Sequence, residues 1–153
     1  MSDVFTPEQR SAVMARIRSA DTRPEVALRK ALHARGLRYR LHDRRLPGRP
    51  DVVFAGPRVA LFVHGCFWHG HDCARGARAP KANAAYWSAK IARNRDRDAR
   101  NLSALMERGW IVRVVWTCEI ATARALDATA SRLADEIRAT RQEKTAPERP
   151  GAV

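Results

Sequence analysis

Ten consecutive residues, 64–73, concentrate the histidines and cysteines of this chain. They read His-Gly-Cys-Phe-Trp-His-Gly-His-Asp-Cys and hold three of the five histidines and two of the three cysteines. Packing alone does not explain this density. Cysteine and histidine are the side chains that bind zinc well, and histidine titrates near neutral pH. The segment therefore predicts a loop that is built around a metal ion, a catalytic group or both.

A third cysteine, Cys118, lies just beyond an apolar run that ends at Trp116. Structural zinc requires four soft or borderline ligands, often a short spaced group and one distant residue. The candidate ligands are Cys66, His71, Cys73 and Cys118. Their spacing matches no standard zinc finger, and the alternative is that Cys118 is a small buried residue and the loop cysteines are incidental. We favour zinc, because two thiols and two imidazoles in one loop rarely lack a purpose.

The charge of the chain points to a polyanionic partner. The 153 residues, enough for one domain, carry 29 Lys+Arg against 16 Asp+Glu and a net charge of +13. Nucleic acid is the first candidate, and the alternative is an arginine-rich bias spread over the surface. The longest apolar run, residues 59–63, is far too short to span a membrane, and no signal peptide is evident. An odd cysteine count favours a reducing compartment, which predicts a cytoplasmic protein.

Apolar spacing and turn residues predict the order α-α-β-β-β-α-β-α, a mixed sheet flanked by helices. The first two helices are expected over residues 6–18 and from about residue 22 to Gly36. Strands are expected over residues 37–41, 51–54, 58–63 and 110–116, with the second and third forming a hairpin. The other two helices are expected over residues 84–108 and around Leu126, Leu133 and Ile137. Residues 1–142 would form one domain, and residues 143–153 a disordered polar tail.

Asp51 opens the first strand of this hairpin, where aspartate is unfavourable. The hairpin would bring Asp51 near Val63, at the end of the partner strand. A carboxylate beside a main-chain carbonyl suits Mg²⁺, which prefers oxygen ligands. His69 would then be placed to take a proton from a water that attacks phosphorus. The alternatives are that Asp51 is a turn residue after Pro50 and that His69 is a further zinc candidate.

Three other polar residues have ordinary explanations from the sequence alone. His64 is either a satisfied histidine at a strand end or a catalytic group. Glu25 would complete a capping box with Thr22. Asp98 lies in an alternating run of charges, residues 93–98, that could form a solvated helix face.

Aromatic residues in the polar loop suggest a nucleic-acid contact. Phe67 and Trp68 are adjacent there, and exposed aromatics beside basic residues can stack on bases or wedge between them. The alternative is ordinary core packing, which the pattern favours for Trp87 and predicts for Trp110 and Trp116.

Several of these stretches closely resemble one known family, the very-short-patch mismatch repair endonucleases (Vsr). The resemblance rests on residues 46–51, 63–69, 90–98 and 110–118 and extends over about residues 3–137. It implies a variant of the restriction-endonuclease-like fold that contains a structural zinc site. It also implies magnesium-dependent nicking of duplex DNA on the 5′ side of the T in T:G mismatches, which arise when 5-methylcytosine deaminates. The expected partner is double-stranded DNA, with mismatch-repair proteins as further candidates, and a monomer suits an asymmetric mismatch.

The resemblance also assigns roles to residues of the active site. Asp51 would bind magnesium together with the main-chain carbonyl of Val63, and His69 would be the general base. The residues that hold metal-bound waters would be Glu25, His64 and Asp98, and the zinc ligands would be the four named above. This changes the expectation for Glu25 and Asp98 from scaffold to site.

For DNA contact, the resemblance implies an aromatic wedge of Phe67, Trp68 and Trp87 beside the mismatch, with Met14 acting from the other groove. The chain departs from the wider nuclease motif, because a second acid and a lysine are absent after Asp51. Residues 74–85 also match poorly, which affects the expected flanking-sequence preference. Two alternatives stay open: a related nuclease with a different target, and a non-catalytic zinc module that only binds DNA.

Overall fold

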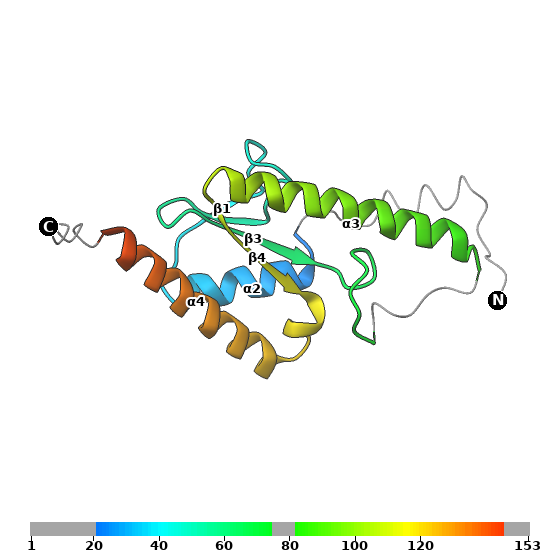
Figure 1. Ribbon diagram of the computed structural model, residues 1–153. Helices are drawn as coiled ribbons and strands as arrows, with labels where there is room; N and C mark the ends of the chain where they lie inside the picture. Colours follow the sequence, from blue (N-terminus) through cyan, green and yellow to red (C-terminus); the bar gives the residue numbers. More distant parts are fainter. Residues whose placement is uncertain (1–20, 75–81, 146–153) are drawn as a thin grey trace, which may run out of the picture.

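The computed structural model describes residues 21–74 and 82–145 (Figure 1). The predicted helix over residues 6–18 lies outside this range, and so does Met14. Within the described residues, no helix is both long and apolar enough to cross a bilayer.

The first described helix, α2, spans Arg23–Ala34. Pro24 lies in its first turn, where a missing N–H costs nothing. Gly36 follows the helix with φ +87° and donates its N–H to the carbonyl of His33, which ends the helix where the sequence predicts. Thr22 is the N-cap residue, yet its side chain makes no capping hydrogen bond. The expected capping box between Thr22 and Glu25 is therefore not formed, and Glu25 is available for other contacts.

Four strands form one mixed sheet in the order β1-β2-β3-β4. They are β1 (Arg40–Leu41), β2 (Val52–Phe54), β3 (Val59–His64) and β4 (Ile111–Trp116). The first two pairings, β1 with β2 and β2 with β3, are antiparallel, and β3 pairs with β4 in parallel. The predicted hairpin is confirmed, but only two residues of the predicted strand 37–41 pair in the sheet.

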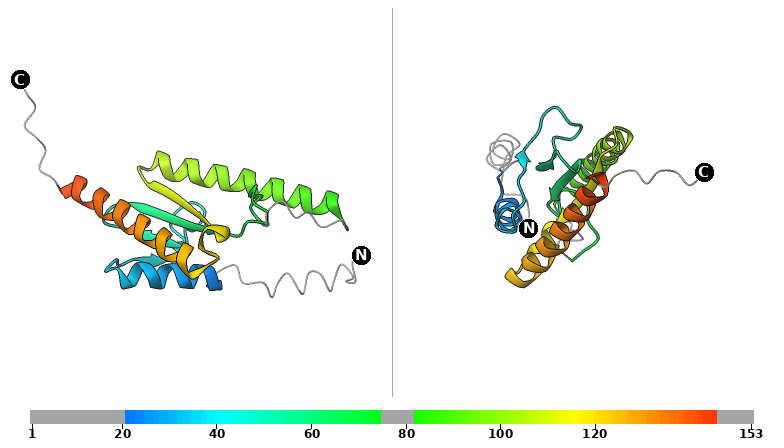
Figure 2. Two further views of the ribbon diagram at one scale, coloured as in Figure 1. Left: turned by 90° about the horizontal axis from the view of Figure 1, so that it is seen from below. Right: turned by 90° about the vertical axis from the view of Figure 1, so that its left-hand side faces the viewer.

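Two long helices and a short 3-10 turn complete the described chain. They are α3 (Ala84–Glu107), the 3-10 turn η1 (Thr117–Ile120) and α4 (Ala123–Thr145). The last helix includes three residues of the tail predicted from residue 143. The α3 helix lies along one face of the sheet, and α2 and α4 cover the other (Figure 2). The predicted mixed sheet flanked by helices is confirmed, whereas the restriction-endonuclease-like variant stays a prediction.

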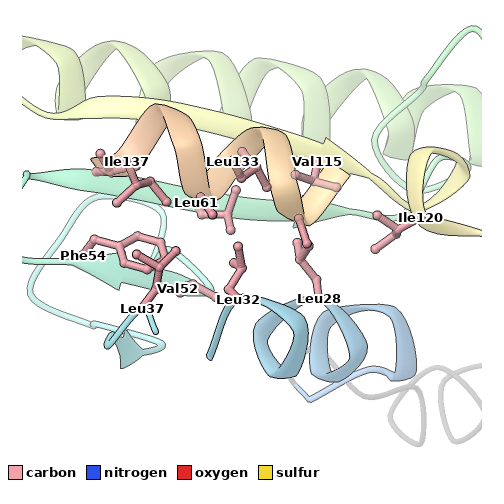
Figure 3. Packing of buried hydrophobic residues seen from close by; sticks show 13 residues of the cluster. Leu28, Leu32, Leu37, Val52, Phe54, Leu61, Val115, Ile120, Leu133 and Ile137 are labelled. Atoms are coloured by element: carbon pink, nitrogen blue, oxygen red, sulfur yellow. The ribbon is translucent and has the colours of Figure 1, made fainter. Parts of the chain in front are cut away.

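Side chains of β3 alternate between two apolar clusters, as a period of two requires. Val59 and Leu61 join Leu28, Leu32, Leu133 and Ile137 in the larger cluster between the sheet and α2 with α4 (Figure 3). Ala60 and Phe62 pack with Leu105 on the side of α3. His64 continues the second series. The alternation therefore directs a histidine toward α3 at the end of the strand.

Candidate active site and metal centre

A cavity of about 670 Å³ opens where the ends of β2 and β3 meet α2 and α3. It collects residues that are far apart in sequence. Its lining includes Glu25, His42, Asp51, Val63, His64, Trp68, His69, Asp98, Asn101 and Thr117. All five predicted catalytic residues therefore line one cavity, and Val63 lies beside them.

Asp51 lies immediately before β2, and the hairpin brings it to Val63 as predicted. The main-chain N–H of Val63 donates to Asp51 Oδ2 at 2.7 Å. Burial raises the pKa of Asp51 to about 6, against the lowering effect of this hydrogen bond, and the charge of Glu25 raises it further. A buried carboxylate with a raised pKa gains from a nearby cation, because the cation offsets the cost of burying the charge.

His69 and Asp98 form a hydrogen-bonded pair between the loop after β3 and helix α3. His69 Nδ1 lies 2.5 Å from Asp98 Oδ2. A carboxylate accepts the hydrogen bond, so Nδ1 carries a proton, and in the neutral ring the free lone pair is on Nε2. Asp98 therefore does not lie on a solvated helix face, as its sequence context suggested, but orients the ring of His69.

His64, the last residue of β3, stacks its ring on the ring of His69. Burial, together with the neighbouring His69, lowers the pKa of His64 to about 4, although Asp98 acts in the opposite direction. His64 is therefore neutral at pH 7.

Glu25 contacts a histidine that the sequence did not single out. His42 Nε2 lies 2.5 Å from Glu25 Oε1, and Glu25 is 2% exposed. The sequence offered one signal for His42, since it follows the strand that would pair with the strand starting at Asp51. That pairing was too short and too distant in sequence to be predicted in register.

The four predicted zinc ligands converge. The Sγ atoms of Cys66, Cys73 and Cys118 and a ring nitrogen of His71 all lie within 4.8 Å of one another. Tetrahedral zinc with sulfur ligands at about 2.3 Å would place them about 3.8 Å apart, so a small contraction suffices. Burial and the neighbouring thiols raise the pKa of Cys118 to about 12, a cost that coordination removes because a bound thiol is deprotonated. The donor set fits a structural zinc ion.

The parallel pairing of β3 with β4 explains this convergence. His64 and Trp116 are the last paired residues, and Cys66 and Cys118 each follow two positions later. The Trp116 ring stacks on His71 at 4.2 Å and contacts His64 edge-on at 5.3 Å. Trp116, expected in the core, is instead half-buried between the Cys/His cluster and the cavity.

The three predicted wedge aromatics also meet. Ring centroids of Phe67, Trp68 and Trp87 lie 5.1 to 5.7 Å apart, and all three residues are half-buried. Lys90 Nζ lies 5.5 Å from the Trp68 ring, and Asn94 donates to the Trp68 carbonyl at 2.8 Å. The structure therefore places Trp87, in the first turn of α3, against the loop aromatics and outside both apolar clusters.

Comparison with known proteins decides the family. A family model described as DNA mismatch endonuclease Vsr matches residues 2–75. Over 120 residues the chain is 42% identical to the DNA mismatch endonuclease Vsr of Escherichia coli K12, covering 78% of this chain and 76% of that protein. Over 135 residues it is 50% identical to the type II nicking enzyme V.XorIIP of Xanthomonas oryzae pv. oryzae, covering 88% and 98%. The chain belongs to the Vsr family.

A further relative of this Vsr-family protein is the type II nicking enzyme V.NmeAIP of Neisseria meningitidis serogroup A. It is 43% identical over 138 residues, covering 90% of this chain and 98% of that protein. The Vsr-family chain is thus a DNA endonuclease, a hydrolase that acts on phosphodiester bonds, and DNA is its partner. The alternative of a non-catalytic DNA-binding module is wrong.

Proposed function

We propose that this Vsr-family endonuclease nicks duplex DNA on the 5′ side of the T in a T:G mismatch and requires magnesium. The observation that carries the proposal is one cavity that holds Asp51, Val63 and the His69–Asp98 pair, with Trp68 on its wall. A metal site, a base and an aromatic wedge would thereby act on the same phosphodiester.

Asp51 and the main-chain carbonyl of Val63 are the proposed magnesium ligands. The N–H and C=O of one strand residue point to the same edge of the strand. Since the Val63 N–H reaches Asp51, the Val63 carbonyl faces the same side, and the valine side chain is not needed for binding. Bound magnesium supplies positive charge beside the scissile phosphate. In the proposal, Glu25, His64 and Asp98 hold waters around the site.

His69 is the proposed general base. Asp98 holds the proton on Nδ1, so that Nε2 can accept a proton from water as its oxygen attacks phosphorus. The new P–O bond forms as the bond from phosphorus to the 3′ oxygen breaks. That oxygen leaves as a 3′-hydroxyl after taking up a proton, and the phosphate stays on the 5′ end.

Zinc on Cys66, His71, Cys73 and Cys118 would fix the loop that carries His69 and the aromatics. Phe67, Trp68 and Trp87 would wedge beside the mismatch, where a wobble pair stacks less well than a matched pair. Met14 would act from the other groove. The net charge of +13 would supply affinity for any duplex without discrimination. We propose a monomer that works in the cytoplasm, where the chromosomal DNA of bacteria lies.

A nicking assay tests the proposal. The substrates are duplexes that carry each possible mismatch in one sequence context, and the cleaved strand is mapped by its end groups. We expect nicking of the T:G duplex 5′ of the T, with 5′-phosphate ends, and a requirement for added Mg²⁺. Equal nicking of matched duplex would favour the second candidate, a related nuclease with a different target. Two relatives are named type II nicking enzymes, without a mismatch in the name.

A further inference from the structure

His42 has an unusual backbone conformation next to the active site. Its φ is +47°, in the left-handed region that non-glycine residues rarely adopt. Its N–H donates to the main-chain carbonyl of Asp51 at 3.2 Å, which continues the β1–β2 pairing by one residue. Conformations of this kind persist where the surrounding structure determines them and cluster at functional sites.

The left-handed backbone coincides with a side chain that contacts α2. His42 Nε2 lies 2.5 Å from Glu25 Oε1, and the exposed fractions of the two side chains are 15% and 3%. A carboxylate this deeply buried requires donors. The other donor is Arg29, whose Nη1 is 3.4 Å from the same oxygen but 2.6 Å from Asp21. His42 is therefore the closer partner of Glu25.

Both donors approach Oε1. Neither of these contacts involves Oε2, which leaves that oxygen to accept a hydrogen bond from water in the cavity that Glu25 and Asp51 line together. The direction of Glu25 is thus set by a residue whose own backbone is bonded to Asp51.

We infer that His42 is a positioning residue that aims Glu25 at the water shell of the metal held by Asp51. The inference rests on the proposed function, since it gives Glu25 a role only if that site binds magnesium. His42 touches neither the DNA nor the metal in this account. It acts through Glu25, and its effect should vanish when Glu25 can no longer act.

A double-mutant cycle tests this dependence. The variants are His42→Ala, Glu25→Gln and the double variant. His33→Ala is the matched control, because His33 is an exposed histidine on α2, the helix that carries Glu25. We expect His42→Ala to lower kcat for the T:G duplex about tenfold to hundredfold, the loss typical of a hydrogen bond to a charged group, with KM for DNA nearly unchanged. In the Glu25→Gln background the same change should cost less than about twofold. His33→Ala should leave kcat unchanged.

A second readout is Mg²⁺ binding to the zinc-loaded, DNA-free protein, measured by titration calorimetry. His42→Ala should weaken binding severalfold, but not in the Glu25→Gln background. His42→Gln should recover most activity and binding, because its amide N–H can still donate to Oε1. Unfolding midpoints identify a variant that fails to fold. If His42→Ala is such a variant, His42→Asn takes its place in the cycle, because asparagine tolerates the left-handed backbone but its shorter side chain does not reach Glu25.

Two results would overturn the inference: equal losses from His42→Ala in both backgrounds, or a His42→Gln variant that folds and is as inactive as His42→Ala. Failure of the proposed function looks different. In that case Glu25→Gln alone would have no effect on nicking or on Mg²⁺ binding, whatever His42→Ala does.

Discussion

The rings of His64 and His69 are stacked with centroids 3.9 Å apart and planes 4° from parallel. Two positive charges at this separation would repel strongly, so the pair accommodates one proton far more readily than two. Burial and the neighbouring ring lower the pKa of His64 to about 4, so His64 is neutral at pH 7, and it is His69 that contacts Asp98. The stack therefore places a neutral imidazole against the ring of the proposed base.

Replacement of Asp98 by asparagine should prevent His69 from acting as the proposed base. The amide can donate to Nδ1, which favours the tautomer that carries its proton on Nε2 and has no lone pair there. We expect Asp98→Asn to lower the single-turnover nicking rate by roughly hundredfold or more, close to the effect of His69→Ala. Asp96→Asn on the exposed side of α3 is the matched control and should nick normally. A fully active Asp98→Asn variant would remove His69 from the role of base.

Asp51→Asn should abolish nicking and yet stabilise the magnesium-free protein. The pKa of Asp51 rises from 3.8 to about 6 on folding, so the folded state favours the neutral carboxyl. That stability is fully present below pH 3.8 and is lost as the pH rises through 6, an effect of about 3 kcal/mol at most. Thermal unfolding at pH 8 without magnesium should show a higher midpoint for Asp51→Asn, by up to about 10 °C.

The pH dependence provides the control for Asp51. At pH 4 the difference between Asp51→Asn and the unmodified protein should largely disappear. The buried neutral His64 has the opposite effect, because its contribution to the stability of the protein is lost as the pH falls from 6.5 through about 4. This loss occurs in both proteins and therefore cancels in the comparison. Equal midpoints at pH 8 would show that the Asp51 carboxylate bears no burial cost.

Removal of one zinc ligand should release the metal. We expect freshly purified protein to contain one zinc per chain and Cys118→Ser to contain little. The variant should also unfold at a markedly lower temperature, because metal binding contributes to folding. Elemental analysis and thermal unfolding measure both effects, with His33→Ala as a control that keeps its zinc. Active protein that contains no zinc would contradict the assignment.

Trp68→Ala should reduce mismatch selectivity more than duplex affinity. Loss of the ring opens the aromatic cluster next to the cavity, while the basic surface still binds DNA. We expect nicking of the T:G duplex to fall much more than binding to matched duplex. Trp110→Ala is the control, since Trp110 lies before β4, at the far end of that strand from Trp116, and should leave the ratio of nicking rates intact. An unchanged ratio for Trp68→Ala would exclude the wedge.

Gly70→Ala should displace the loop that carries His69. Gly70 has φ +65°, and a Cβ there would lie 2.8 Å from Ile91 Cγ2 and from Arg95 Cδ on α3. We expect the free energy of unfolding to fall by about 2–4 kcal/mol, because left-handed strain and overpacking act together, and we expect slower nicking. Gly36→Ala has similar strain, with φ +87° but nothing within 4 Å, and should cost only about 1–2 kcal/mol. Urea unfolding of both variants separates the two contributions.

The local sequence pattern predicted those contacts of the site that lie at the ends of neighbouring strands. The hairpin and its turn residues sufficed to bring Asp51 to Val63, and residue chemistry with strand ends sufficed for Cys66 and Cys118. The contact of Glu25 with His42 could not be predicted in this way. A local capping box offered Glu25 a competing partner, and His42 is placed by the pairing of a two-residue strand with a strand beyond the intervening loop.

The position of Trp116 also could not be predicted from the local sequence pattern. Its apolar strand predicted a core position, because sequence alternation cannot show where the layer of α3 stops covering the sheet. The strand extends to the rim of the cavity, and its last ring contacts three histidines.

The register of β3 and β4 has a consequence for comparing family members of different lengths. The two cysteines each follow a paired residue by two positions, so the thiols stay level only if the spacings His64 to Cys66 and Trp116 to Cys118 are equal. An insertion in the long connection between the strands leaves both offsets intact, whereas one extra residue at position 65 or 117 alone would separate the thiols while the sheet still formed. We therefore expect family members that bind the proposed zinc ion to keep a cysteine two positions past the end of each of these strands.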